Sequence, residues 1–200
     1  MKKTKDSVKI KGKVTICGYK AGTLKKIEPL MFKLKDLTLK SGNQAIITQI
    51  RADIHAILQK GKLSEVSNHN LIMTGANIGR DLIVQALNGF LVSPVYGLAI
   101  NYLAIGTGAT APTATDTQLT AEVARAVIAY SQDITYNELL LQAFFTDAQL
   151  ANGTYKEVGS FVGGTASLNS GQIFNHALFA APYVKTAGMD TTVQITFTIS

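Results

Sequence analysis

The chain has 200 residues, of which 46% are hydrophobic, so it can bury one sizeable core or two small ones and is not a disordered tail protein. Its single cysteine, Cys17, excludes a fold framed by intrachain disulfides. The net charge of +6 is divided unevenly, since residues 1–100 hold sixteen Lys/Arg against six Asp/Glu and residues 101–200 hold three against seven. Such asymmetry indicates a contact with nucleic acid or a membrane, or else two halves that meet complementary neighbours in an assembly.

The first forty residues predict a small basic β-hairpin. Apolar residues alternate with polar ones from Val8 to Ile16, which is the period of a strand with one buried face. Lys9, Lys11 and Lys13 then share the opposite face. Residues 24–27 and 30–34 are predicted to return as further strands.

Two helices are predicted next. Isoleucine and leucine recur at three- and four-residue steps from residue 46 to residue 58, and Gly61 is placed to end that helix. A second helix is expected at about residues 76–88, ended by Gly89. We therefore expect a basic N-terminal docking unit over residues 1–68, made of a β-hairpin plus a helix, and a second domain over residues 69–200.

Beyond residue 101 the chain predicts strands separated by turn signals. The expected strands are 101–105, 123–130, 134–145, 155–162, 172–180 and 191–199. Several short strands at this spacing indicate a sandwich or a distorted barrel. The predicted fold class is mainly β with two helices (α+β), with an antiparallel β-sandwich-like C-terminal domain.

The stretch Asn101–Arg125 predicts a pinned connection between two strands. Gly106 and Gly108 permit backbone angles that other residues resist, and Pro112 fixes its own φ. The glycines do not form a phosphate-binding loop, because G-x-G-x-x-G is missing and no Lys-Ser/Thr follows.

Four charged residues stand out in the mostly apolar second half: Glu122, Arg125, Glu157 and Lys185. A charge in a strand that is predicted to be buried must pair or face water, because a buried unpaired charge costs roughly 3–5 kcal/mol. An Arg125–Glu157 or Lys185–Glu157 pair would clamp the Asn101–Arg125 loop to neighbouring strands. The alternative is that each charge is solvated independently.

No catalytic, metal or cofactor site is predicted. The three histidines, His55, His69 and His176, lack the spacing of metal ligands. The basic start never enters the apolar run of a signal peptide, and polar residues interrupt the apolar region 82–105, so neither export nor a membrane span is expected. Nucleic acid is not the expected partner, since few aromatic residues accompany the lysines.

Several motifs together resemble a known class. They are Tyr102-Leu-Ala-Ile-Gly-Thr-Gly, Asp116-Thr-x-Leu119-x-x-Glu122-x-x-Arg125, Glu157-Val-Gly-x-Phe161, Ile173-Phe-Asn-His-Ala-Leu-Phe179 and Lys185-Thr186. In this order they are similar to a widespread class of tailed-bacteriophage virion proteins, described as tail, tail-fibre-associated or minor structural proteins. The resemblance covers about residues 70–200. It departs from the class at His176, where an arginine is often expected.

The resemblance implies a non-enzymatic virion protein that is assembled in the host cytoplasm, binds copies of itself and docks neighbouring virion proteins in the tail, baseplate, neck or fibre attachment. It implies no reaction and no cofactor. The alternatives are a receptor- or glycan-recognition module on the particle surface, with a host-surface glycan as its ligand, and a capsid decoration or head-fibre protein. An enzyme that acts on cell-wall polymer ranks third.

Overall fold

The computed structural model describes residues 9–39, 44–76, 78–87, 99–135 and 137–200. These residues form three helices and eight strands. The helices are α1 (Thr23–Leu39), α2 (Gln44–Gly61) and α3 (Arg80–Leu87). The strands are β1 (Ile10–Lys20), β2 (Lys62–Ile72), β3 (Ile100–Gly106), β4 (Glu122–Thr135), β5 (Glu138–Phe145), β6 (Gly153–Val162), β7 (Gln172–Lys185) and β8 (Met189–Ile199).

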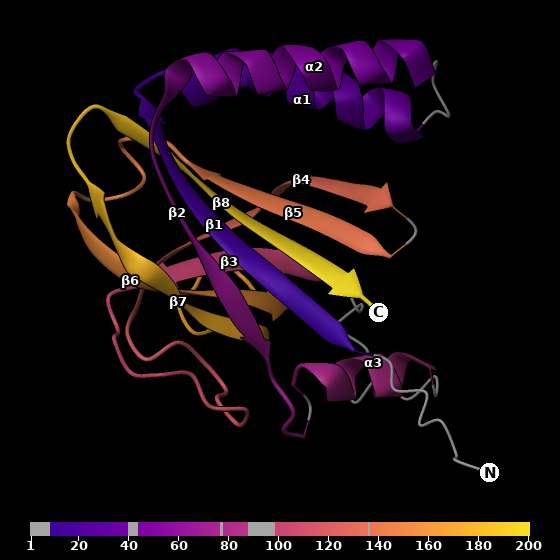
Figure 1. The fold of residues 1–200 in the computed structure, drawn as a ribbon, viewed down its shortest axis with the longest axis vertical. Coiled ribbons are helices and arrows are strands. Elements are labelled where there is room, and N and C mark those ends of the chain that lie inside the picture. The colour runs from indigo at the N-terminus through magenta and orange to yellow at the C-terminus, as the bar shows by residue number, and fades with distance from the viewer. Residues whose placement is uncertain (1–8, 40–43, 77, 88–98, 136) are drawn as a thin grey trace.

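The eight strands close into one antiparallel barrel in the order β1-β2-β7-β6-β3-β4-β5-β8 (Figure 1). The expected sandwich is therefore wrong in its architecture, although the mainly β class is confirmed. β2 and β4 join the two sheets of the barrel, because β2 pairs with β1 and with β7, and β4 pairs with β3 and with β5. Alternate residues such as Val14, Leu103 and Ile195 point inward and fill the interior with apolar side chains.

The predicted boundary after residue 68 falls inside β2. β1 pairs with β8 over eleven residues, from Ile10 opposite Ile199 to Lys20 opposite Met189, and with β2 on its other side. The N-terminal strand and the C-terminal strand are thus neighbours in the barrel. Residues on both sides of the predicted boundary contribute to the same core.

The expected return strands at 24–27 and 30–34 are wrong, because α1 occupies this segment. Leu24, Ile27 and Leu34 are buried at helical spacing, whereas Phe32, which completed the apparent alternation, is 69% exposed. A short apolar run fits both periods, and packing against α2 decides between them. The first predicted helix, over residues 46–58, is confirmed as α2, and it ends at Gly61 as expected.

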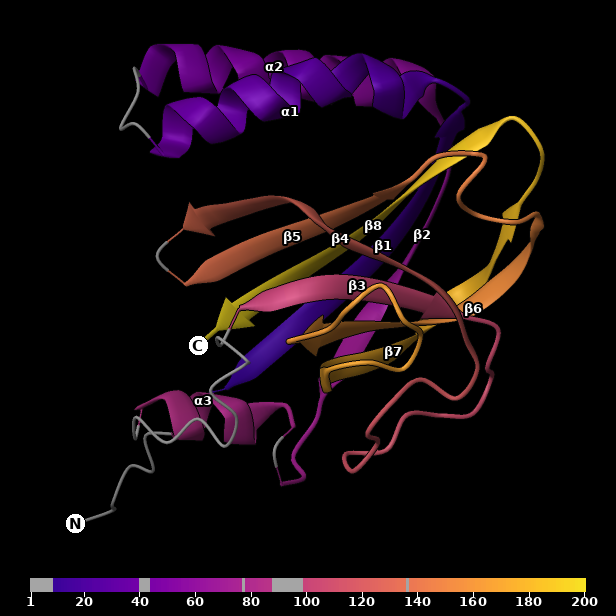
Figure 2. The same ribbon diagram turned by 180° about the vertical axis from the view of Figure 1, so that it is seen from behind.

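The helical hairpin of α1 and α2 lies across the outside of the barrel (Figures 1 and 2). Its buried stripe packs on the outward side chains of β1, including Cys17 and Tyr19, and on the half-buried Tyr130 and Phe144. The six strands predicted after residue 101 are all present, whereas β2 was not predicted. The helix expected at 76–88 is shorter, since α3 begins at Arg80; its predicted stop, Gly89, lies outside the described residues.

Candidate functional site

Glu157 of β6 is a fully buried carboxylate at the root of the loop between β3 and β4. Its Oε1 accepts hydrogen bonds from the backbone N–H groups of Gly108 (3.0 Å) and Ala121 (2.7 Å). Its Oε2 accepts one from the backbone N–H of Thr120 (2.9 Å) and lies 3.0 Å from Nε2 of His176. One carboxylate therefore ties both ends of this loop to the barrel.

His176 of β7 links Glu157 to a second carboxylate. Its side chain is 1% exposed, and its Nδ1 lies 2.7 Å from Oδ2 of Asp116, in the middle of the loop. Asp116 also accepts hydrogen bonds from the backbone N–H and the hydroxyl of Thr113. Both ring nitrogens of His176 are thus occupied by carboxylates, and the imidazole joins two strands to the loop.

The network shifts the pKa values of all three groups. Burial lowers the pKa of His176, but the hydrogen bonds and charges of Glu157 and Asp116 outweigh it and raise that pKa above 6.5. Burial raises the pKa of Glu157, but hydrogen bonds from His176 and the backbone hold it below 4.5. Burial likewise raises the pKa of Asp116, yet bonds from Thr113 and His176 hold it below 3.8.

These shifts determine how the network contributes to stability. A raised histidine pKa adds stability that is complete below pH 6.5 and is lost as the pH rises through the folded-state value. The lowered carboxyl pKa values add stability that is present above pH 4.5 and 3.8 and is lost as the pH falls through the folded-state values. The whole contribution is therefore present in mildly acidic solution, between about pH 4.5 and 6.5.

Gly106 and Gly108 allow the backbone of the loop to pack closely against the carboxylate of Glu157. Neither has a positive φ, so the expectation that they provide unusual backbone angles is wrong. A Cβ atom on either residue would overlap Oε1 of Glu157. Leu119 of the same loop is 1% exposed and packs with Ala104, Phe161 and Ile173 outside the barrel interior. Pro112 is half-buried in the loop.

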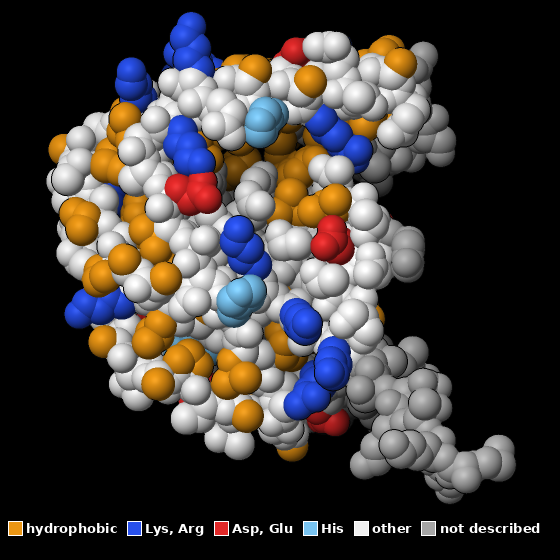
Figure 3. All heavy atoms as spheres, viewed as in Figure 1, with side chains coloured by type: hydrophobic (Ala, Val, Ile, Leu, Met, Phe, Trp, Pro, Cys, Tyr) orange, Lys and Arg blue, Asp and Glu red, His pale blue; other side chains and the backbone are white. Residues whose placement is uncertain are grey.

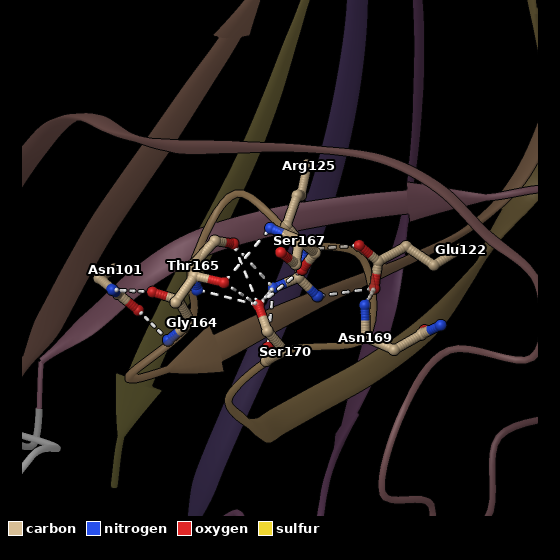
Figure 4. A network of polar contacts seen from close by, with 8 residues as sticks. All are labelled: Asn101, Glu122, Arg125, Gly164, Thr165, Ser167, Asn169 and Ser170. Carbon is tan, nitrogen blue, oxygen red and sulfur yellow. Dashed lines mark hydrogen bonds and ion pairs between the residues drawn. The ribbon is translucent and has the colours of Figure 1, made fainter.

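A second network holds the loop between β6 and β7 (Figure 4). Arg125 of β4 donates from Nε to Glu122 Oε1 (2.5 Å) and from Nη2 to Glu122 Oε2 (2.7 Å). Its Nη1 donates to the backbone oxygen of Ser170 (2.7 Å) and to that of Thr165 (3.3 Å). Glu122 in turn accepts from the backbone N–H of Asn169 (3.2 Å).

Aromatic rings complete the environment of Arg125. Its guanidinium carbon lies 4.6 Å from the ring centroid of Phe161 and 5.7 Å from that of Tyr102. The side chains of Arg125 and Glu122 are 1% and 0% exposed. A planar guanidinium that pairs with a carboxylate in a fork and stacks on rings satisfies a buried charge better than an ammonium would.

Lys185 belongs to a third network at the opposite end of β6 and β7. Its buried Nζ donates to Asp147 (2.6 Å) and Asn152 (3.2 Å). The hydrogen bonds from Lys185 and from the backbone N–H of Gly188 lower the pKa of Asp147. Asp190 accepts from the backbone N–H groups of Asp147 and Leu24, both 3.0 Å, and so joins this network to the start of α1.

The expected partners of the four charges are therefore wrong. Arg125 pairs with Glu122 and Lys185 with Asp147, while Glu157 is held by His176 and three backbone N–H groups. Sequence reasoning missed the roles of His176 and Asp116. The available signal was that both stand inside the motifs that carry the virion-protein resemblance.

The described lysines of the N-terminal strand lie apart from these networks. Lys9, Lys11 and Lys13 are exposed at the start of the chain, with Lys11 and Lys13 on the outer side of β1. β1 is an internal strand of the barrel, so these lysines do not protect a sheet edge. Basic side chains and histidines gather on the face that carries β1 and β2 (Figure 3).

The networks hold loop backbone in place. His176 is enclosed with both nitrogens engaged, and the carboxyl oxygens of Glu157 are shared among four donors. Within the described residues, no cluster of His, Cys, Asp and Glu has the arrangement of a metal site. None of the described helices has the length and apolar content needed to span a bilayer. No family model, curated protein or solved structure matches this chain.

Proposed function

We propose that this chain is a non-enzymatic structural component of a tailed-phage particle, which binds copies of itself and docks neighbouring virion proteins. The observation that carries the proposal is the use made of the motif residues. Four charged residues of the motifs that define the resemblance are used in this way: Asp116, Glu122, Arg125 and Glu157. Arg125 pairs with Glu122 and holds the backbone of the loop between β6 and β7. Glu157 holds the backbone of the loop between β3 and β4, and Asp116 contacts His176. Such loops keep one shape, which favours a surface built for protein contacts.

Apolar side chains around the Arg125–Glu122 pair give this surface a contact patch. Val123 and Val127 flank Arg125 on the same side of β4 and are 44% and 55% exposed. Leu168, in the loop that Arg125 holds, is 49% exposed. Exposed apolar groups that share a rigid surface are typical of protein interfaces. We propose that a second copy of the chain covers this patch.

Size-exclusion chromatography with light scattering over a range of concentrations tests this proposal. We expect an oligomer that Val127→Lys dissociates, because the substitution buries a charge in the interface. Val184→Lys is the matched control, since Val184 is 56% exposed at the far end of β7. A strict monomer at high concentration, or equal effects of the two variants, would contradict the assembly proposal.

The alternative from another class is a glycan- or receptor-recognition module. Tyr155 is 4% exposed and its hydroxyl donates to the backbone oxygen of Ala151, so its ring is not available to stack on a sugar. Tyr102 is half-buried beside Arg125. Saturable binding on a glycan array that Tyr102→Ala abolishes would favour recognition over assembly at this surface.

A further inference from the structure

A cleft of about 360 Å³ separates α2 from the outer side of the barrel. Arg51, His55 and Gln59 of α2 line one wall, and outward side chains of β1, β4, β5 and β8 line the other. Figure 3 shows this hollow between the helices and the barrel. Its volume falls in the range of pockets that bind small organic molecules.

The cleft carries an excess of positive charge. Among the described residues that line it, Glu65 is the only carboxylate, and it pairs with Lys62. Arg51 and Lys13 also line it, and neither forms a salt bridge within the described part of the chain. Nε of Arg51 is buried and has no hydrogen-bond partner among the residues that the structure describes. A buried, unsatisfied cationic donor is costly unless an acceptor reaches it.

Neighbouring side chains that line the cleft supply further donors. Arg51 lies near the Tyr130 hydroxyl, which donates to Oε1 of Gln132. Gln142 donates from Nε2 to Oε1 of Gln194 (2.8 Å). Both bonds use an amide oxygen of a cleft-lining glutamine and leave its Nε2 group for another acceptor. The cleft is therefore rich in donors as well as in positive charge.

We propose that this cleft binds a sugar-sized ligand that carries one oxyanion, a carboxylate or a phosphate. Arg51 holds the oxyanion, because a guanidinium presents paired N–H donors to carboxylate or phosphate oxygens. Gln132 and Gln194 donate to the hydroxyl oxygens of the ligand, and Lys13 adds charge at the mouth. The proposal rests on the cleft alone and does not require the virion assignment.

Isothermal titration of the full chain with glucuronate, glucose 6-phosphate, glucose and inorganic phosphate tests the site. We expect glucuronate or glucose 6-phosphate to bind saturably and more tightly than the other two ligands. Arg51→Gln is expected to weaken that binding at least about tenfold, as the loss of charge-assisted hydrogen bonds does. Lys13→Gln, at an exposed position that cannot disturb the core, is expected to weaken it roughly threefold.

Lys60→Gln is the matched control, since Lys60 is an exposed cation of α2 that does not line the cleft. It is expected to leave binding unchanged, and circular dichroism checks that each variant is folded. The site is overturned if neither glucuronate nor glucose 6-phosphate binds at about 10 mM, a concentration of the order of a weak Kd. Glucose binding equally well would overturn the oxyanion requirement, and inorganic phosphate binding equally well would overturn the sugar-sized ligand. If Arg51→Gln does not fold, Lys13→Gln and Lys60→Gln still test the site. Equal effects of these two variants on ligand binding would overturn it.

Discussion

Replacing Glu157 by glutamine tests the loop clamp with almost no change in side-chain volume. The carboxylate accepts three backbone N–H groups and faces His176 Nε2. An amide oxygen can keep the bonds from Gly108 (3.0 Å) and Ala121 (2.7 Å), but the new NH₂ group then faces the N–H of Thr120. One backbone donor loses its acceptor, and the buried imidazole of His176 loses one of its two carboxylate partners.

The expected loss follows from these two changes. An unsatisfied buried donor costs about 1–3 kcal/mol, and breaking a buried ion pair costs about 3–5 kcal/mol in total. For a domain of this length, 1 kcal/mol shifts the melting temperature by about 2–4 °C. We therefore expect Glu157→Gln to lower the free energy of unfolding by about 3–5 kcal/mol and the melting temperature by about 6–20 °C.

Thermal and denaturant unfolding measure this loss, and limited proteolysis reports whether the loop at 107–121 is released. Glu138→Gln is the matched control, because Glu138 is a half-buried glutamate of β5 whose carboxylate, within the described residues, accepts only a long bond of 3.4 Å from Thr198. An unaltered melting temperature for Glu157→Gln, or a loss equal to that of the control, would refute the clamp.

Three further predictions concern the same networks. The melting temperature of the unmodified chain should fall as the pH rises above 6.5, because His176 loses its proton. His176→Gln should remove that dependence on pH. An identical pH profile in the variant would contradict the role of His176. Gly108→Ala should destabilise by about 1–3 kcal/mol because its Cβ overlaps Glu157, whereas Gly153→Ala, in open space, should not, as denaturant midpoints would show. Arg125→Lys should cost roughly 2–4 kcal/mol, since an ammonium cannot reproduce the fork to Glu122 and the bonds to Ser170, and an unchanged midpoint would show that charge alone suffices.

Local periodicity predicted most of the strands. From Tyr102 onward each strand of the barrel was expected near its observed position, because alternating apolar residues and Gly-containing turns leave few other conformations. The stripe of α2 and its end at Gly61 were determined in the same way. Segment 24–34 was not, since its apolar residues suit both a helix and a strand until α2 packs against it.

The sequence by itself also identified Glu122, Arg125, Glu157 and Lys185 as charges that need partners, because each stands in an apolar strand. It did not determine which partners they have. Pairing depends on strand order, and closure of the barrel through β2 and β4 places residues far apart in sequence side by side. His176 reaches Glu157 only because β6 and β7 are adjacent, and Asp116 reaches His176 only because its loop folds back over those strands. The chemical demand for a partner is local, whereas the identity of the partner is a property of the tertiary structure.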